Sequence, residues 1–280
     1  MLRVLALAAV PALAIALAAN ASAAERDAGA TRGAAPGPAL VAAVHAGKVV
    51  DLTYAFDEST VYWPTEDGFQ LEKEHDGPAE GGWFYAANRF RTAEHGGTHM
   101  DAPRHFAEGK DTADRVPLSA LVAPVAVVDV SASAERDRDY RVQVSDLEAW
   151  EKKHGRVPDG AIVLMRSGWG ARWPDKGRYL GTAEHGDTRN LHFPGFSKEA
   201  AEWLVRDRSV AAIAVDTASI DHGPSRDFIV HQIVNGANKP GFENVAHAEL
   251  LPEAGATLVV LPMKIGGGSG GPARIIAILP

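Results

Sequence analysis

The sequence predicts a single mixed α/β domain, and three observations lead to this fold class. Short apolar segments with the composition of strands alternate along the chain with segments of helical periodicity. No convincing internal repeat interrupts this alternation. About 255 of the 280 residues remain after the predicted signal peptide, residues 1–24, is removed, and this length fits one large domain. We therefore expect one domain over residues 39–280.

The first 24 residues have the pattern of a secretory signal peptide. Arg3 gives the start of the chain a positive charge, residues 4–19 are almost purely apolar, and small residues surround the predicted cleavage point at Ala23 or Ala24. The alternative is a membrane anchor, which needs roughly 20 apolar residues. Because this run is short and contains Pro11, we expect cleavage and export to the periplasm or the medium.

Composition limits the partners and the chemistry of the mature chain. There is no cysteine, so a thiol nucleophile is excluded and a metal site must use nitrogen and oxygen ligands. The net charge is −8, and no run of Lys or Arg stands out, which argues against nucleic acid as a partner. No long apolar segment follows the leader, so we expect a soluble protein without stable membrane insertion.

The elements of the N-terminal third follow from composition. Residues 25–38 are rich in Ala, Gly and Pro and are predicted to be a flexible leader. We expect a short helix over residues 39–46 and a strand over residues 48–56. A second strand over residues 83–93 runs directly into His95, and strand ends are where scaffolds commonly place functional groups.

Strands and helices alternate downstream. The predicted strands are apolar and rich in β-branched residues, and they cover residues 125–130, 161–165, 210–215, 257–261 and 273–279. The predicted helices cover residues 145–154, 197–206 and 227–235. The first has Ser145 and Glu148 at the spacing of a capping box, with Gly155 after its end, and the second has Ser197 as its N-cap.

The densest group of candidate functional residues lies in residues 95–106. His95, His99, Asp101 and His105 fall within eleven positions, and neutral imidazoles with a carboxylate suit a divalent ion such as zinc or manganese. Two glycines and a proline within this segment disfavour a helix. We therefore expect a turn that leads into an extended segment, with Asp101 placed centrally enough to bridge two metals.

Other candidates are ambiguous on sequence alone. His231 lies in an apolar helical segment, where a histidine satisfied within the core is an equal alternative to a ligand. Glu243 follows a turn and reads by default as a solvated acid. Asp216 and Asp221 follow a strand and are either site residues or cap residues. Surface positions are expected for His45, His75, His154 and His247, and the roles of His185, His192 and His222 stay open.

Two further motifs narrow the chemistry. The glycine-rich run at residues 266–271 lacks the Gly-Lys-Ser/Thr ending of a phosphate-binding loop, and we expect a tight loop whose backbone lines a pocket. No Gly-x-Ser-x-Gly elbow is present. The chemistry is therefore expected to come from metal, histidine and carboxylate.

The segment from His95 to His105 resembles a known family signature. It has every specified position of the pattern His-x-Gly-Thr-His-x-Asp-x-Pro-x-His of the cyclase-like metal hydrolases, a family that includes bacterial kynurenine formamidase and isatin hydrolase. Supporting matches cover much of the mature chain, namely residues 62–64, residues 216–221, His231, Glu243 and residues 266–274.

The resemblance implies a fold, an assembly and a set of roles. The fold would be a compact mixed α/β domain with a β-barrel-like core of the swivelling β/β/α type, assembled as a homodimer or homotetramer. One or two divalent ions, zinc or manganese, would be bound per subunit. The implied roles are metal binding for His95, His99 and His231, bridging of two metals for Asp101 and Glu243, proton transfer for His105 and substrate contact for Trp63.

The expected function is hydrolysis of the C–N bond of a small amide, with a metal-bound hydroxide and His105 as the proton shuttle. N-formylkynurenine and the cyclic amide isatin both fit, although export argues against N-formylkynurenine as the physiological substrate. Flat apolar surface for an aromatic substrate is available from Tyr62, Trp63, Trp83, Phe84 and Trp169, or these are ordinary core aromatics. The alternatives are a cyclase, dehydratase or lactonase with the same site, or a non-catalytic metal-binding protein of the envelope, which would not need His105.

Overall fold

The computed structural model describes residues 36–280, so the predicted signal peptide and most of the predicted leader lie outside the described residues. Helix α1 (Pro36–His45) begins three residues before the predicted helix and includes the last residues of the predicted leader. Within residues 36–280, no helix is long and apolar enough to cross a membrane.

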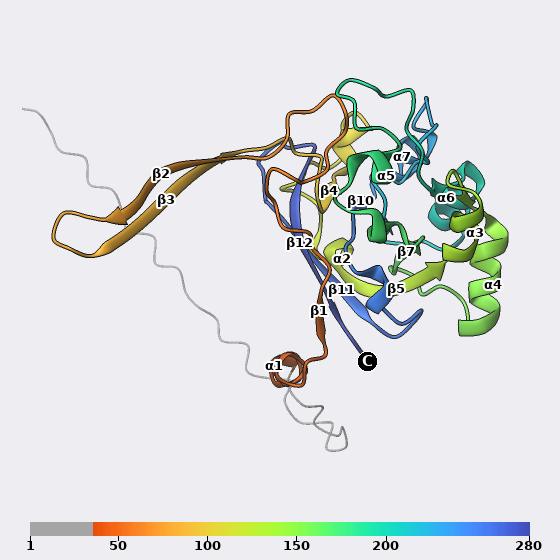
Figure 1. Ribbon diagram of the computed structural model, residues 1–280. Coiled ribbons are helices and arrows are strands. Elements are labelled where there is room, and N and C mark those ends of the chain that lie inside the picture. Colours follow the sequence, from red (N-terminus) through yellow and green to blue (C-terminus); the bar gives the residue numbers. More distant parts are fainter. Residues whose placement is uncertain (1–35) are drawn as a thin grey trace, which may run out of the picture.

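Within residues 36–280, seven strands close into a barrel, which confirms the predicted β-barrel-like core (Figure 1). The ring runs in the order β12, β11, β5, β7, β9, β10, β4 and back to β12, and the short strand β1 (Val49–Asp51) pairs with β12 beside it. The bounds of the ring strands are β4 His99–Asp101, β5 Val122–Asp129, β7 Ile162–Arg166, β9 Ala212–Val215, β10 Gly241–Glu243, β11 Thr257–Pro262 and β12 Gly270–Ile278.

The apolar composition of β5, β7 and β9 follows from their burial on both faces. On the inner face, Val125, Val127 and Leu164 belong to the core that fills the barrel. The alternate residues, such as Val128 and Met165, pack outward into a second core. These parallel strands confirm the predictions for residues 125–130, 161–165 and 210–215, with shifts of a few residues at the ends.

Helices cover the outer face of these three strands. Side chains of α4 (Val144–His154), α6 (Lys198–Asp207) and α7 (Ile229–Gly236) complete the second core. Ser197 caps α6 as predicted, since its side chain accepts a hydrogen bond from Ala200 N at 3.1 Å. The remaining short segments are α2 Leu118–Leu121, α3 Ser131–Arg136, α5 Lys176–Leu180, β6 Arg141–Val142, β8 Gly195–Phe196, and the 3-10 turns Pro103–His105, Trp169–Arg172 and Ala248–Leu250.

The predicted capping box of α4 is wrong. The helix begins one residue earlier than predicted, so Ser145 lies inside its first turn and cannot cap it. The box instead joins Gln143 and Asp146, and the Asp146 carboxylate accepts a hydrogen bond from Gln143 N at 2.8 Å. Gly155 ends the helix with a φ of 88°, as its position predicts.

A two-stranded arm projects from the barrel and consists of β2 (Gln70–Pro78) and β3 (Phe84–Arg91) (Figure 1). The strand predicted over residues 83–93 is therefore real, but it pairs with β2 and is not a barrel strand. The strand predicted over residues 48–56 is limited to β1.

The barrel interior provides a direct test of the fold. Leu164 is fully buried on β7, and we expect Leu164→Ala to lower the free energy of unfolding by about 2–5 kcal/mol, because the substitution leaves a cavity that the closed ring cannot collapse to fill. The control is Leu250→Ala, where the side chain is 55% exposed and the change should be within about 0.5 kcal/mol. Urea denaturation measures both, and equal effects would contradict this account of the core.

Candidate metal centre

The segment from His95 to Asp101 has the turn and strand that its sequence predicts. Gly97 has a φ of 57°, and a Cβ at Gly96 would lie 2.0 Å from the ring of Tyr62, so both positions require glycine. The chain then enters β4, which pairs with β10 on one side and β12 on the other. Barrel closure at β4 therefore holds His99 and Asp101 in a rigid, buried strand.

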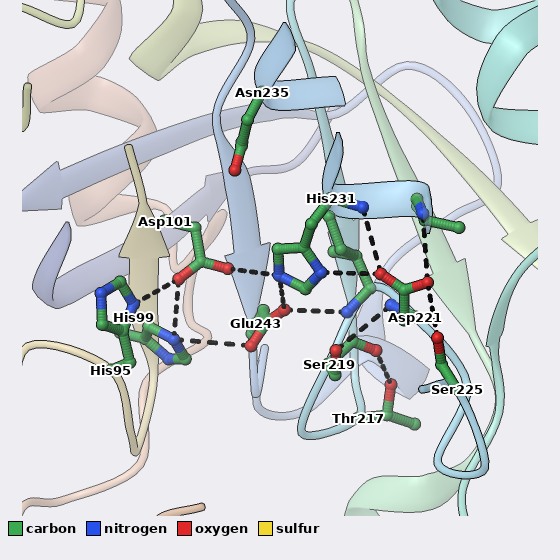
Figure 2. Close-up of polar contacts among 12 residues, drawn as sticks. His95, His99, Asp101, Thr217, Ser219, Asp221, Ser225, His231, Asn235 and Glu243 are labelled. Atoms are coloured by element: carbon green, nitrogen blue, oxygen red, sulfur yellow. Dashed lines mark hydrogen bonds and ion pairs between the residues drawn. The ribbon is translucent and has the colours of Figure 1, made fainter. Parts of the chain in front are cut away.

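Two elements far along the chain bring the remaining predicted ligands to β4 (Figure 2). Glu243 on β10 is the cross-strand neighbour of His99, and its Oε2 lies 3.5 Å from His99 Nε2. His231 on α7 lies on the other side of the carboxylates, with Nε2 3.2 Å from Asp101 Oδ2 and 3.3 Å from Glu243 Oε1. His95 Nδ1 completes the group at 2.6 Å from Asp101 Oδ1. All five residues predicted as metal ligands thus meet in one cluster.

The ring orientation of two histidines is set by hydrogen bonds on the side away from the cluster. His99 Nδ1 donates to Gly97 O at 2.9 Å, and Asn244 Nδ2 donates to the same carbonyl at 2.7 Å. His231 Nδ1 donates to Asp221 Oδ2 at 2.7 Å (Figure 2). Each ring therefore directs Nε2 at the carboxylates, as metal-binding histidines do.

The third histidine is oriented by a chain of two side chains. Ser269 Oγ donates to Glu94 Oε2 at 2.6 Å, and this leaves the hydroxyl oxygen to accept from His95 Nε2 at 2.9 Å. His95 consequently presents Nδ1 to Asp101. Ser269 belongs to the glycine-rich run, in which a Cβ at Gly270 would lie 2.5 Å from His95 Cε1. This loop supports His95, and its residues are not among those that line the cavity beside the cluster.

The donor set of the cluster fits a divalent cation. The Nδ1–H of His99 donates to Gly97 O, so in the neutral ring Nε2 carries no proton and can only accept a hydrogen bond. Nε2 nevertheless faces the oxygens of Asp101 and Glu243, which are acceptors as well. His99 Nε2 is correspondingly buried without a hydrogen-bond partner, although Asp101 Oδ1 is 3.2 Å away. A cation between these groups would satisfy all of them, and nitrogen with carboxylate oxygen is a ligand combination that zinc and manganese accept.

The electrostatics of the cluster also call for positive charge. Burial raises the pKa of Glu243, and the neighbouring charge of Asp101 raises this pKa further. Burial opposes the charged form of His99, but Asp101 and Glu243 outweigh it and raise the pKa of His99 to about 9. The pKa of His231 is raised well above its ordinary value because its hydrogen bonds to three carboxylates outweigh burial. Two adjacent buried carboxylates thus attract either protons or a cation.

His105 lies beside the cluster in the turn Pro103–His105. Its ring stacks on that of His95 with centroids 3.7 Å apart. Burial lowers the pKa of His105 to about 3, which favours the neutral ring. Ligand atoms of His95, Asp101 and His105 all lie within 4.8 Å of one another, as do those of His99, Asp101 and Glu243. His105 therefore lies against the cluster, and its proton-transfer role stays a prediction.

A cavity of about 440 Å³ opens onto the cluster. Trp63 lies in its wall, with its ring 5.9 Å from that of Phe228, and its contact with a substrate stays a prediction. Phe106 adds a third aromatic ring to the wall, 5.4 Å from Phe228. Val61, Tyr62 and Ala218 add further apolar surface.

Three of the predicted substrate aromatics lie elsewhere. Trp83 and Phe84 belong to the projecting arm and are 59% and 69% exposed. Trp169 packs with Tyr179 in a buried cluster behind Val61 and Trp63 and does not itself line the cavity. Sequence reasoning missed Phe106 and Phe228, because their positions in the wall depend on how the turn after β4 meets the start of α7.

The structure shows what several residues with previously open roles contact. Asp221 orients His231, as described above, whereas Asp216 does not line the cavity. The Asp216 carboxylate accepts hydrogen bonds from Ser167 and from the backbone N–H of Gly168, and these bonds join the ends of β7 and β9. Burial raises the pKa of Asp216 to about 6. His192 pairs with Asp139 and, like His185 and His222, does not line the cavity.

The sequence did not identify three residues that orient the predicted ligands, namely Glu94, Ser269 and Asn244. Its only signal was that Glu94 is adjacent to His95 and that Asn244 is adjacent to Glu243.

Known proteins resemble this chain in both sequence and fold. Residues 50–222 match the family model described as "Putative cyclase". The chain is 34% identical to isatin hydrolase from Roseibium aggregatum over 217 residues, which cover 75% of this chain and 79% of that protein. It is 25% identical to kynurenine formamidase from Salinibacter ruber, over 81% of this chain and 96% of that protein. The structure of isatin hydrolase A from Ralstonia solanacearum superposes with a TM-score of 0.79 and 34% identity, covering 90% of this chain and all of that one.

Proposed function

Because the chain belongs to the cyclase family and is a hydrolase, we propose that it hydrolyses the C–N bond of a small, neutral, aromatic amide in a divalent-metal-dependent reaction. The single observation that carries this proposal is the position of the histidine and carboxylate cluster on the wall of an apolar, aromatic cavity. Two similar proteins, isatin hydrolase and kynurenine formamidase, have names that specify the hydrolysis of a cyclic amide and of an aryl formamide.

The charge of the cavity favours a neutral amide. Among the described residues, the cavity wall includes the acids Glu66 and Glu94 and neither Lys nor Arg. N-formylkynurenine is an amino acid with a carboxylate and an ammonium group, and its carboxylate would find no Lys or Arg partner on this wall. A fused lactam such as isatin carries no charge and presents a flat ring to Trp63, Phe106 and Phe228, where offset or edge contacts are favourable.

The division of carboxylate oxygens supports two metal positions. Asp101 directs Oδ1 to His95 and His99 and Oδ2 to His231. Glu243 divides its oxygens in the same way, with Oε2 towards His99 and Oε1 towards His231. We propose that both acids bridge, with His95 and His99 binding one ion and His231 the other.

The residues of the chain have separate tasks in the proposed reaction. When bound, a divalent ion supplies Lewis acidity and lowers the pKa of water from 15.7 to about 7. The aromatic wall orients the amide plane and excludes bulk water. The His105 ring stacks on that of His95 beside the cluster, and in the proposed reaction it accepts a proton from the attacking water and returns it to the departing nitrogen.

The substrate test compares isatin, formanilide and N-formylkynurenine with enzyme of measured metal content. We expect turnover of isatin and formanilide and a lower kcat/KM for N-formylkynurenine, since formanilide shares its formamide group but lacks its carboxylate. Metal removal with a chelator should abolish turnover, and zinc or manganese should restore it. Turnover of N-formylkynurenine above that of formanilide would contradict the charge argument, and metal-loaded enzyme without turnover of any amide would contradict the proposed reaction.

The Glu94–Ser269 pair gives a prediction about metal affinity. Ser269→Ala removes the acceptor that holds His95 Nε2, so His95 Nδ1 is no longer held towards Asp101. We expect about a 10- to 100-fold weaker metal affinity, which is the usual effect of removing a group that orients a ligand. Chelator competition measures it, with Ser59→Ala as an exposed serine control that should bind metal normally. Unchanged affinity in Ser269→Ala would show that the pair does not orient His95.

We further propose that the reaction takes place outside the cytoplasm, on the basis of the predicted signal peptide. The substrate would then be an amide met in the periplasm or the medium. Cell fractionation with antibody detection tests this proposal, and mature protein found in the cytoplasmic fraction would contradict it.

A further inference from the structure

The hydroxyl of Tyr179, near the end of α5, is buried behind the candidate metal centre. Its side chain is fully buried, and the hydroxyl donates to Asn244 Oδ1 at 2.9 Å and to Asp216 O at 3.0 Å. A hydroxyl has one proton, so these two acceptors share it. Tyr179 does not line the cavity. Its hydroxyl therefore acts on the protein and not on a substrate in the cavity.

A chain of three hydrogen bonds connects this hydroxyl to His99. Asn244 Nδ2 donates to Gly97 O at 2.7 Å, and His99 Nδ1 donates to the same carbonyl at 2.9 Å. A carbonyl can only accept, so the atom of the Asn244 side chain that faces Gly97 O must be the nitrogen. The oxygen of the Asn244 amide then faces Tyr179 and needs a donor, which the hydroxyl supplies. The direction of every bond in the chain is thus fixed by the groups themselves.

The Tyr179 ring is held in place by its own surroundings. Trp169 Nε1 donates to Tyr179 O at 2.7 Å, and Tyr179 N donates to Asp175 O at 2.7 Å. The ring meets that of Trp173 edge-on, with centroids 5.2 Å apart. The hydroxyl is therefore a fixed point from which the side chain of Asn244 can be oriented.

This hydroxyl also keeps its proton. Burial raises the pKa of Tyr179 well above its ordinary value, and the neighbouring Tyr54, Asp216 and Glu243 raise it further. The neutral hydroxyl is consequently the form present around neutral pH. It remains a hydrogen-bond donor to Asn244 throughout that range.

Asn244 lies between two proposed metal ligands. It follows Glu243 in the chain, and its side chain reaches the carbonyl that orients His99. Its backbone is tied on both sides, since Asn244 N donates to Thr217 O at 2.9 Å and Asn244 O accepts from Thr98 Oγ1 at 2.7 Å. Its φ of 53° is one that asparagine adopts more readily than most residues. The backbone at this position is thus fixed, and the orientation of the side-chain amide is what Tyr179 sets.

We propose that Tyr179 is a positioning residue for the proposed metal position at His99. Its hydroxyl holds the Asn244 amide, the amide holds the Gly97 carbonyl, and this carbonyl directs His99 Nε2 at Asp101 and Glu243. Without the hydroxyl, Asn244 Oδ1 loses its donor in a buried site, and the amide loses the bond that fixes its orientation. This inference rests on the metal binding in the proposed function.

Packing alone does not account for a tyrosine at this position. The ring belongs to the aromatic cluster with Trp169 and Phe193, and Trp63 from the cavity wall packs against that cluster. A phenylalanine would supply the same ring to this cluster. The hydroxyl is what phenylalanine lacks, and its one side-chain partner is Asn244. The cluster that supports the aromatic wall therefore also supports His99.

Chelator competition with zinc tests the proposal without any assay of activity. We expect Tyr179→Phe to weaken metal affinity by about 10-fold, the lower end of the effect of removing a group that orients a ligand. Tyr140→Phe is the matched control, because it also removes a hydroxyl that donates to a side chain, that of Asp146 at 2.8 Å, but does so outside the cavity wall. It should bind zinc normally, and unchanged affinity in Tyr179→Phe would overturn the proposal.

A double-mutant cycle tests whether Tyr179 acts through Asn244. Asn244→Gly removes the side chain and tolerates the φ of 53°, and we expect about a 10- to 100-fold loss of zinc affinity. If the hydroxyl acts only through this amide, adding Tyr179→Phe should cause no further loss. A double variant in which the two losses multiply would overturn the proposed route. Circular dichroism confirms that each variant is folded.

Hydrogen-exchange NMR on the wild type needs no variant. We expect the side-chain amide protons of Asn244 to exchange slowly with water, since both ends of this buried amide are hydrogen-bonded. Fast exchange would overturn the proposal even where Tyr179→Phe does not fold. A wild type that binds no divalent ion would contradict the proposed function itself. Normal zinc binding by both the wild type and Tyr179→Phe would contradict only the role of Tyr179.

Discussion

Asp101→Ala is expected to abolish both metal retention and turnover. Asp101 is 1% exposed, and its two oxygens face three histidines of the cluster, so the substitution removes the group common to both proposed metal positions. Residues that merely orient a ligand are worth about 10- to 100-fold in metal affinity, and loss of the bridging ligand should exceed that range. Elemental analysis after dialysis gives the metal content, and hydrolysis of isatin on the same sample gives the turnover.

Asp216→Asn is the control for this experiment. Asp216 is nearly as buried as Asp101, at 2% exposure, but its carboxylate accepts from Ser167 and lies outside the cavity wall. We expect this variant to lose thermal stability and to keep its metal. An Asp101→Ala protein with full metal content and activity would show that Asp101 does not bridge.

His105→Ala is expected to retain metal while kcat falls by about 10²- to 10⁴-fold, the usual worth of general acid–base catalysis. The His105 ring stacks on His95 at 3.7 Å and lines the cavity, whereas the five proposed ligands stay in place without it. Metal analysis and steady-state kinetics on the same preparation separate the two effects. The exposed His45 supplies a control, since His45→Ala should change neither quantity.

The same experiment distinguishes two roles for His105. Its ligand atom lies within 4.8 Å of those of His95 and Asp101, so the geometry also accommodates metal binding. Loss of metal from His105→Ala, together with loss of turnover, would make His105 a ligand and would contradict the proton-transfer role.

Much of the fold was predictable because its central strands obey local rules. The strands β5, β7 and β9 are buried on both faces, and their continuous apolar runs identify them without any tertiary information. Helix α6 was equally clear, with Ser197 at its start. Predictions failed where short elements depend on their partners. Strand β10 has three residues and no strand-like composition, and it forms because β4 and β9 lie on either side of it.

The residues of the candidate site likewise fall into those that the sequence identified and those that it left ambiguous. The segment from His95 to His105 was recognisable because its ligands, glycines and proline lie close together in the chain. His231 and Glu243 were ambiguous from their surroundings alone, since a buried histidine and a glutamate after a turn have commoner explanations. Family resemblance raised them to candidates, and the pairing of β10 with β4 brings Glu243 beside His99.

The sequence by itself determined which ligand atoms a metal could find, nitrogen and oxygen in a chain without thiols, and it placed a turn at Gly96 and Gly97. These features follow from residue types and local backbone geometry, which are properties of adjacent positions. The tertiary structure decided which nitrogen of His95 and His231 faces the carboxylates, because Ser269 and Asp221 reach these rings from other segments of the chain. For His99 the local Gly97 carbonyl sets the ring, and Asn244 holds that carbonyl from across the fold. Barrel closure is the physical reason, since it sets side by side strands that lie more than a hundred residues apart.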